Sequence, residues 1–388
     1  SRAAEVDKFV SDNDDMLIVF AAGNIGHQAK SGTITSPSTA KNCLAVGASQ
    51  TTTESFVKSV EYEDFSAIFS LLTSVGIPVS SPDACCAVRL ANPDQTALVH
   101  RLCCPSKMKD AYRSGYFDRN NLAYFSSRGP TTDGRIKPDV VGPGYNVVSM
   151  HSDGDPTSNQ CSTSRPNGGN TAALMTLQGT SMATPLVSGS AALVRQYYRK
   201  LGVNPSGPLL KATLIHSGEY LTGTISLNGG NLREQLPAQP NHNSGFGLVS
   251  LSNVLAFADS AFKLYFYDRR PVESNGQDAF CFVATKPGAK ARATLVYYDP
   301  PASPSAKNLL VNDLDLDLFT YKNGSKSAIR SPGNGQEGGD TKNTVERADL
   351  IDIPEGNIVV VAVTGSRVKG TQKFSVVVTG DVQQLDGG

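Results

Sequence analysis

The pattern of apolar residues changes near residue 262, and this change predicts two different kinds of fold. Before it, unbroken apolar runs such as "MLIVFAAGN" and "NCLAVGAS" are typical of strands buried on both faces of a parallel sheet between helices. After it, short β-branched or aromatic runs alternate with Gly, Pro and Asn turns, which predicts an antiparallel sandwich or barrel. We therefore expect part of an α/β domain over residues 1–261, followed by a β-sandwich or barrel domain over residues 262–388.

Helical periodicity is confined to the first domain. We expect helices in the opening segment, from about Ser181 onward, over "GPLLKATLIHSG" and near residues 250–258. The small residues that follow Ser181 allow close approach of neighbours, so this helix is expected to be central and buried on most sides. A third apolar run, over residues 141–150, is expected in the sheet. Residues 52–120 lack periodicity and are expected to form a surface insertion.

Charge and hydropathy exclude two classes of partner. Lys and Arg total 35 and Asp and Glu total 35, so the chain has no basic surplus that would favour nucleic acid. No run of 18 or more apolar residues predicts a membrane span. We expect neither a nucleic-acid nor a membrane partner.

Cysteine usage favours an oxidising compartment. Four of the seven cysteines form two adjacent pairs, Cys85 with Cys86 and Cys103 with Cys104, a spacing that does not fit a zinc site. Disulfides are the first interpretation and free thiols the alternative, and the odd count leaves at least one cysteine without a partner in the chain. Together with a glycosylation sequon at Asn323, this predicts a secreted or extracellular protein, or one in the lumen of an oxidising compartment.

Ser181 in "LQGTSMATPLVSG" has two interpretations. It is a cap of a buried helix, or it is a nucleophile at a helix N-terminus where the preceding glycine lets a substrate approach. Pro185 fits both, because an N–H in the first turn has no helical partner to lose. The residues alone leave both interpretations open.

The motif "GTSMATP" resembles the nucleophile motif of subtilisin-like serine proteases, the subtilases. Further segments resemble that family in the same order along the chain: "FAAGN", "KNCLAVGAS", "FSSRGPTTDGRIKPDVVGPG" and "SGFGLVSL". The all-β segment with "LVNDLDLDL" is similar to the C-terminal β-barrel of a subgroup of alkaline secreted subtilases. The resemblance covers nearly the whole chain apart from the insertion.

This resemblance implies a hydrolase that cleaves peptide or protein substrates. Ser181 corresponds to the nucleophile and Asn24 to the side-chain donor of the oxyanion hole, while Gly23, Gly179 and Thr180 lie where substrate binds. A neutral amide stabilises developing negative charge without competing for the proton, and one such donor contributes roughly 3–4 kcal/mol of barrier lowering.

A serine nucleophile also needs a base and a carboxylate that orients it. The five histidines, His27, His100, His151, His216 and His242, lie outside any "H-G-T-H"-like motif and are interpreted as surface or packing residues. We expect the base and its carboxylate to come from an upstream segment, the N-terminal half of the same catalytic domain, and this chain alone to be inactive. The alternative is a catalytically inactive subtilase-fold protein with a binding or structural role.

Alternation in "VNDLDLDLF" places Asp313 and Asp315 on one face of a strand and leucines on the other. The leucine face is expected in the core. In one interpretation the carboxylates belong to a solvated outer face. In the other, which the resemblance implies because related barrels bind calcium, they belong to a structural calcium site that Asp340 and its loop complete. No cofactor is expected for catalysis.

Overall fold

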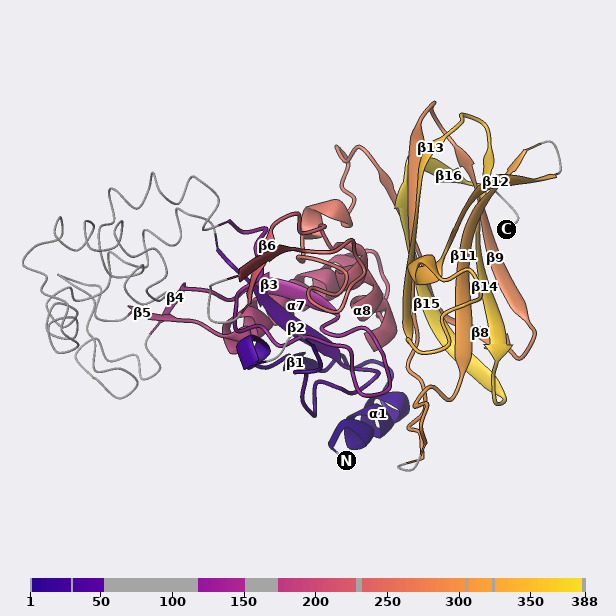
Figure 1. The fold of residues 1–388 in the computed structure, drawn as a ribbon. Helices are drawn as coiled ribbons and strands as arrows, with labels where there is room; N and C mark the ends of the chain where they lie inside the picture. The colour runs from indigo at the N-terminus through magenta and orange to yellow at the C-terminus, as the bar shows by residue number, and fades with distance from the viewer. Residues whose placement is uncertain are drawn as a thin grey trace, which may run out of the picture.

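The computed structural model describes residues 2–28, 31–51, 118–150, 174–227, 232–303, 306–322 and 325–385. It consists of an α/β part followed by two antiparallel sheets, so the expected fold class is confirmed (Figure 1). The expected insertion over residues 52–120 lies almost entirely outside the described residues.

A three-stranded parallel sheet forms the centre of the α/β part. Its strands are β1 (Val19–Ala21), β2 (Leu44–Ser49) and β3 (Val140–Pro143), in the order β1-β2-β3. Every residue of β2 is buried, as its unbroken apolar run predicts. The apolar run over 141–150 does not stay in this sheet. Gly142-Pro143-Gly144 ends β3, and β4 (Val147–Met150) pairs antiparallel with β5 (Leu174–Leu177) instead.

The described helical segments before the sandwich include α1 (Arg2–Asp12), the 3-10 turn η1 (Gly26–Gln28), α7 (Thr180–Lys200) and α8 (Gly207–His216). Of these, α7 packs against all three strands of the sheet. Every residue of α8 is buried, and its N-terminus is capped by Ser206, whose side chain accepts the Leu209 N–H. The helix expected near 250–258 is only a 3-10 turn, η4 (Leu251–Asn253), because Val254 N–H bonds back to the carbonyl of Leu251. A further hairpin pairs β6 (Thr224–Leu227) antiparallel with β7 (Leu232–Gln235).

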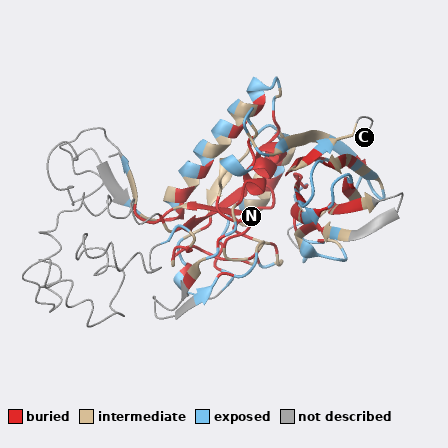
Figure 2. Cartoon of the chain, turned by 90° about the horizontal axis from the view of Figure 1, so that it is seen from above, coloured by how far each residue is buried: buried red, intermediate tan, exposed pale blue. Residues whose placement is uncertain are grey.

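The prediction that α7 is buried on most sides is wrong. Its buried residues are Thr180, Ala183, Val187, Val194 and Tyr198, which lie on one face toward β2 and β3. On the other side Leu186 and Leu193 are 46% and 55% exposed, and the exposed bands along the helix are visible in Figure 2. Small residues do permit close approach, but no described segment covers this face.

Two antiparallel sheets form the C-terminal part. One has the order β13-β10-β15-β8, from β13 (Val345–Ile353), β10 (Ala289–Val296), β15 (Thr371–Gly380) and β8 (Lys263–Glu273). The other has the order β12-β11-β14-β9-β16, from β12 (Ser325–Pro332), β11 (Asp313–Lys322), β14 (Ile358–Arg367), β9 (Gln277–Ala284) and β16 (Val382–Gln384). The sheets are separate, so this part is an open sandwich and not a closed barrel.

The sandwich core lies between these sheets. Leu314, Leu316 and Leu318 of β11 are all buried in it, as the alternation predicts. The opposite face is not uniformly solvated, because Asp313 is also buried. The cause is the segment around Asp340, which covers part of that face.

The four-stranded sheet packs against α8, so the two parts share one interface (Figure 1). Valines of this sheet belong to the same apolar cluster as α8. Polar contacts cross the interface too: the His216 ring lies between Thr294 and Thr379, at 2.9 Å from Nδ1 and 2.8 Å from Nε2. Burial first, and then repulsion from Arg292 and Arg347, holds the pKa of His216 well below its ordinary value. The ring is therefore neutral, donating to one hydroxyl and accepting from the other.

Two arginines of the sandwich satisfy the carbonyls at the end of α8. Arg347 Nη1 donates to the carbonyls of Ile215 and Gly218, and Arg292 Nη1 donates to those of His216 and Gly218. The last carbonyls of a helix have no partners within it, and cations there also interact favourably with its dipole. The sandwich thus supplies hydrogen-bond donors to the carbonyls at the C-terminus of α8.

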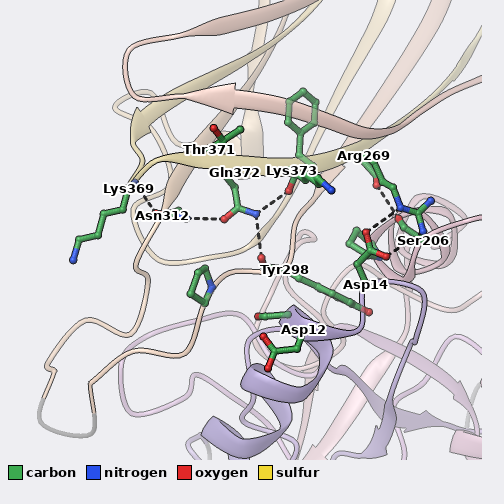
Figure 3. Close-up of a pocket in the computed structure, with 15 residues that line it drawn as sticks. Asp12, Asp14, Ser206, Arg269, Tyr298, Asn312, Lys369, Thr371, Gln372 and Lys373 are labelled. Carbon is green, nitrogen blue, oxygen red and sulfur yellow. Dashed lines mark hydrogen bonds and ion pairs between the residues drawn. The ribbon is translucent and has the colours of Figure 1, made fainter.

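A cavity of about 560 Å³ opens where α1, the start of α8 and the sandwich meet (Figure 3). Two pairs lie within its wall: Arg269 with Asp14, and Gln372 with Asn312. Neither Ser181 nor Asn24 lines it. This cavity is a feature of the domain junction and lies apart from the predicted active site.

Candidate active site

The structure brings Asn24 and the start of α7 together, although they are far apart in sequence. Asn24 follows β1, and its Oδ1 accepts the backbone N–H of Thr180 at 2.8 Å and the Thr180 hydroxyl at 3.0 Å. Ser181 is the next residue, exposed in the first turn of the helix. Because both acceptor bonds use Oδ1, the amide nitrogen of Asn24 remains available as a donor beside Ser181.

Thr180 links the two segments a second time. Its hydroxyl oxygen accepts the backbone N–H of Gly23 at 3.1 Å while donating to Asn24. Thr180 is buried and Asn24 is exposed, so these bonds lie at the edge of the core and are partly shielded from water. The hydroxyl therefore fixes both the side-chain amide of Asn24 and the backbone N–H of Gly23, the residue before it.

Glycines let the two segments approach this closely. Gly179 caps α7 with a φ of +154°, and a Cβ there would stand 3.2 Å from Asn24 Nδ2. Gly23 has a φ of +113°, and a Cβ there would stand 2.8 Å from the Ser127 hydroxyl. A side chain at either position would shift Asn24 or its turn, which explains the glycine in each motif.

The N-terminus of α7 also carries a free donor. Gly179 offers no side-chain cap, and the Ser181 N–H makes no hydrogen bond within the described part of the chain. Helix N-termini favour anions through their free N–H groups and their dipole. Together with Asn24 Nδ2, this N–H makes the site suited to an oxygen that gains negative charge.

None of the histidines that the structure describes hydrogen-bonds to Ser181. His27 is exposed and contacts the Tyr124 ring, with the ring centroids 6.0 Å apart, and His216 is enclosed at the domain interface. His242 is half-buried, and burial lowers its pKa. His100 and His151 lie outside the described residues. Over the described ranges, the site therefore holds an exposed serine hydroxyl and hydrogen-bond donors, with no histidine bonded to that serine.

The predicted carboxylates gather on one side of the sandwich. Asp315 Oδ1 accepts the Asp340 N–H at 3.0 Å, and Asp315 also accepts the Ser366 hydroxyl. Asp340 is held by two asparagines, with Nδ2 of Asn334 at 2.7 Å and Nδ2 of Asn343 at 2.8 Å. In the described ranges, no three Asp, Glu, His or Cys side chains are arranged as a complete metal site.

Glu346 is one of the oxygen donors of the loop 333–346 from which the sequence predicts further calcium ligands, and the structure buries it in this cluster. It is 1% exposed, its Oε2 accepts the Leu316 N–H at 2.8 Å, and its Oε1 has no partner. Asp313 Oδ1 is likewise buried without a partner. Burial, followed by the neighbouring carboxylates, raises the pKa of Glu346 well above its ordinary value, and burial with Asp315 raises that of Asp313 to about 6.

Two cysteines are described, and both are free thiols. Cys43 is buried and Cys281 is half-buried. Burial raises the pKa of the Cys43 thiol, so it is a packed, unreactive group. The adjacent cysteine pairs lie outside the described residues, as does the sequon at Asn323. None of the helices in the described ranges combines the length and apolar character that spanning a membrane requires.

Comparison with known proteins finds one matching family and several relatives. The sequence profile of the Subtilase family matches residues 1–247. The serine protease/ABC transporter B family protein tagD of Dictyostelium discoideum is 32% identical over 450 residues, which cover 99% of this chain and 24% of that protein. Serine protease AprX of Bacillus subtilis is 33% identical over 135 residues, which cover 33% of this chain and 29% of that protein. The minor extracellular protease Vpr of Bacillus subtilis is 40% identical over 101 residues, 26% of this chain and 10% of Vpr. The chain spans less than a third of the length of each of these relatives.

Proposed function

Because this chain belongs to the subtilase family, we propose that the protein containing it is a serine endopeptidase whose nucleophile is Ser181. The observation that carries this proposal is the contact of Asn24 with the first turn of α7, beside an exposed serine hydroxyl. A helix cap would need no such neighbour. An amide donor held next to the hydroxyl is what acyl transfer through a tetrahedral intermediate requires.

In the proposed reaction, Ser181 Oγ attacks the carbonyl carbon of a peptide bond and loses its proton to a base. The carbonyl oxygen becomes an oxyanion, which the Asn24 Nδ2 and the Ser181 N–H stabilise. The leaving amine takes the proton from the base and departs, so an acyl-enzyme remains on Ser181. Water then hydrolyses this ester and restores the hydroxyl.

The base and its orienting carboxylate would come from a segment upstream of this chain, the N-terminal half of the catalytic domain. Support comes from the open face of α7, where Leu186 and Leu193 are exposed between small residues that allow a second element to pack closely. A segment docked on this face would also lie beside Ser181. This chain alone would then be inactive.

The test is covalent labelling of the full-length protein with a fluorophosphonate, followed by mass spectrometry of the peptide that contains residue 181. A serine activated by a base is phosphonylated, and the Ser181→Ala variant should remain unlabelled. Absence of labelling on folded full-length protein, with trypsin labelled in parallel, would contradict the proposal. It would favour a catalytically inactive binding protein that retains the fold.

We propose that the protein acts outside the cytoplasm. The Vpr relative is extracellular by its name, and the adjacent cysteine pairs suit an oxidising compartment. Fractionation of the producing cells with an antibody against the sandwich tests this. Recovery of the mature protein only from the reducing cytosol would contradict it.

We propose in addition that the sandwich holds a structural calcium ion through Asp313, Asp315 and Asp340, with Glu346 as a further ligand. The buried, unpartnered oxygens of Asp313 and Glu346 fit a hard cation, which would relieve the repulsion among these carboxylates. Since the described carboxylates do not complete a site alone, backbone carbonyls or water would supply the remaining ligands.

Thermal unfolding of the chain with and without calcium tests this site. A ligand at 100 times its dissociation constant stabilises by about 2.7 kcal/mol, and Glu346→Gln should remove most of that gain. Asp317→Asn is the matched control, because Asp317 is on the same strand but is paired with Arg330. Equal calcium stabilisation of wild type and Glu346→Gln would contradict the assignment of Glu346, and no stabilisation at all would contradict the site.

A further inference from the structure

Ser127 holds the turn that carries Asn24 from both sides. Its N–H donates to the carbonyl of Gly23 at 2.9 Å, and its hydroxyl accepts the N–H of Ile25 at 3.2 Å. These two groups belong to the residues immediately before and after Asn24. We infer that Ser127 is a positioning residue of the oxyanion site, an inference that rests on the proposed protease function.

The contacts of Asn24 divide into two sets. Thr180 fixes its side-chain oxygen, whereas Ser127 fixes the backbone from which the side chain projects. Both sets are needed, because a side chain anchored at one end can still move as its Cα moves. An oxyanion donor has to be held within about 0.5 Å and 10–20° of its productive geometry.

Ser127 is completely buried, while the turn that it holds is exposed. A buried residue thus supports an exposed turn. Ile25 is 37% exposed, so water can reach its N–H if the Ser127 hydroxyl is removed. Loss of that hydroxyl should therefore change the position of Asn24 more than the stability of the fold.

The neighbouring residue provides a matched control. Ser126 is also completely buried, and its hydroxyl accepts the N–H of Ala48 in β2 at 3.0 Å. Ala48 is itself inaccessible to solvent, so Ser126→Ala leaves a buried N–H without a partner. An orphaned buried donor is costly, and this one is on the sheet and not on the Asn24 turn. The two serines should therefore show opposite phenotypes.

The experiment compares Ser127→Ala and Ser126→Ala in the full-length protein, with fluorescent casein as substrate. We expect Ser127→Ala to lower kcat about ten-fold with little change in KM and in the melting temperature. Ser126→Ala should lower the melting temperature and leave kcat, measured well below that temperature, near the wild-type value. Equal kcat losses in both variants would show a general structural effect and overturn the inference.

A third variant tests whether Ser127 acts through Asn24. In an Asn24→Leu background the donor is absent, so adding Ser127→Ala should lower kcat no further. A further ten-fold loss in that background would contradict the assigned role.

Hydrogen exchange gives a readout that does not depend on catalysis. Ser127→Ala should increase amide exchange in the peptide covering residues 20–26, whereas Ser126→Ala should not. If wild-type protein neither hydrolyses casein nor reacts with fluorophosphonate, the proposed function fails, and the exchange result alone decides whether Ser127 holds the turn. Unchanged exchange in residues 20–26 would overturn the inference whatever the activity.

Discussion

The Lys41 ammonium is ion-paired with the Asp299 carboxylate across 258 positions of sequence, and solvent reaches neither side chain. Lys41 belongs to the α/β part, and Asp299 follows strand β10 of the sandwich. The same ammonium also donates to the carbonyls of Pro300 and Leu309. Among the described residues, this buried charge of the α/β part is thus balanced by the sandwich, so we expect the two parts to unfold together.

Asp299→Asn should destabilise the chain by about 3–5 kcal/mol, because it leaves the Lys41 charge buried without a counter-ion. Chemical denaturation followed by circular dichroism measures this. The Lys41→Met/Asp299→Asn double variant should recover part of the loss. Asp12→Asn, which breaks the exposed Lys8–Asp12 pair, is the control and should change stability by less than about 1 kcal/mol. A similar small change for Asp299→Asn would refute this role of the pair.

Asn24→Leu should lower kcat of the full-length protein by roughly 10²–10³-fold with little effect on KM. The physical reason is that leucine cannot donate to the oxyanion, while the substrate contacts in the ground state remain. Steady-state kinetics on casein provides the measurement. A loss smaller than ten-fold would remove Asn24 from the oxyanion site.

Thr180→Val should lower kcat about ten-fold, because valine keeps the shape of threonine but loses the hydroxyl that fixes Asn24 Oδ1 and the Gly23 N–H. Thr180→Ser retains that hydroxyl and should stay close to wild type. Wild-type activity of Thr180→Val, or a loss in Thr180→Ser as large as that in Thr180→Val, would contradict the role assigned to the hydroxyl.

Arg347→Met should destabilise the chain by about 2–4 kcal/mol, since charge-assisted bonds to the α8 carbonyls are lost in a buried place. Its guanidinium also lies 4.7 Å from the Tyr220 ring centroid, so Arg347→Lys, which lacks the planar fork, should rescue little. Arg330→Met, an exposed arginine paired with Asp317, provides the comparison. Equal melting temperatures for the Arg347→Met and Arg330→Met variants would rule out the capping role.

Lys211 should give the chain a distinctive alkaline pH dependence. It faces the Asp139 carboxylate at 3.5 Å, with the Lys137 ammonium and the Cys43 thiol beside it, and burial lowers its pKa from 10.5 to about 8. Between these pH values the unfolded chain binds the proton and the folded chain does not, so stability rises with pH. Relative to Lys211→Met, the wild type should gain about 1–2 kcal/mol between pH 7.5 and 9.5. A flat difference would show that the Lys211 pKa is ordinary.

Local pattern was enough to predict the main elements. The unbroken run around Leu44 predicts a central strand, and the alternation at Leu314 and Leu316 predicts the core face of β11. The short motifs around Asn24 and Ser181 lie in two segments that the structure joins through the bonds of Asn24 to Thr180. In each case the residues that determine the local structure are close together in the sequence.

Other features depend on contacts between distant segments. The exposure of Leu186 depends on what covers α7, which no pattern within the helix reveals. The burial of Glu346 depends on the segment around Gly333, where a Cβ would stand 1.9 Å from Glu346 Oε2. The role of Ser127 was present in "FSSRGP" only as part of a motif, because its partners Gly23 and Ile25 lie about a hundred positions earlier.

The arginine cap of α8 has a consequence for synthesis on the ribosome. Arg347 follows Ile215 by 132 positions, and translation at roughly 5–20 residues per second needs on the order of ten seconds to cover that distance. Throughout this interval the nascent helix has emerged, but the strands that cover it and bind its last carbonyls have not. The stretch from Gly207 to His216 is therefore the part of the nascent chain that we expect chaperones to engage.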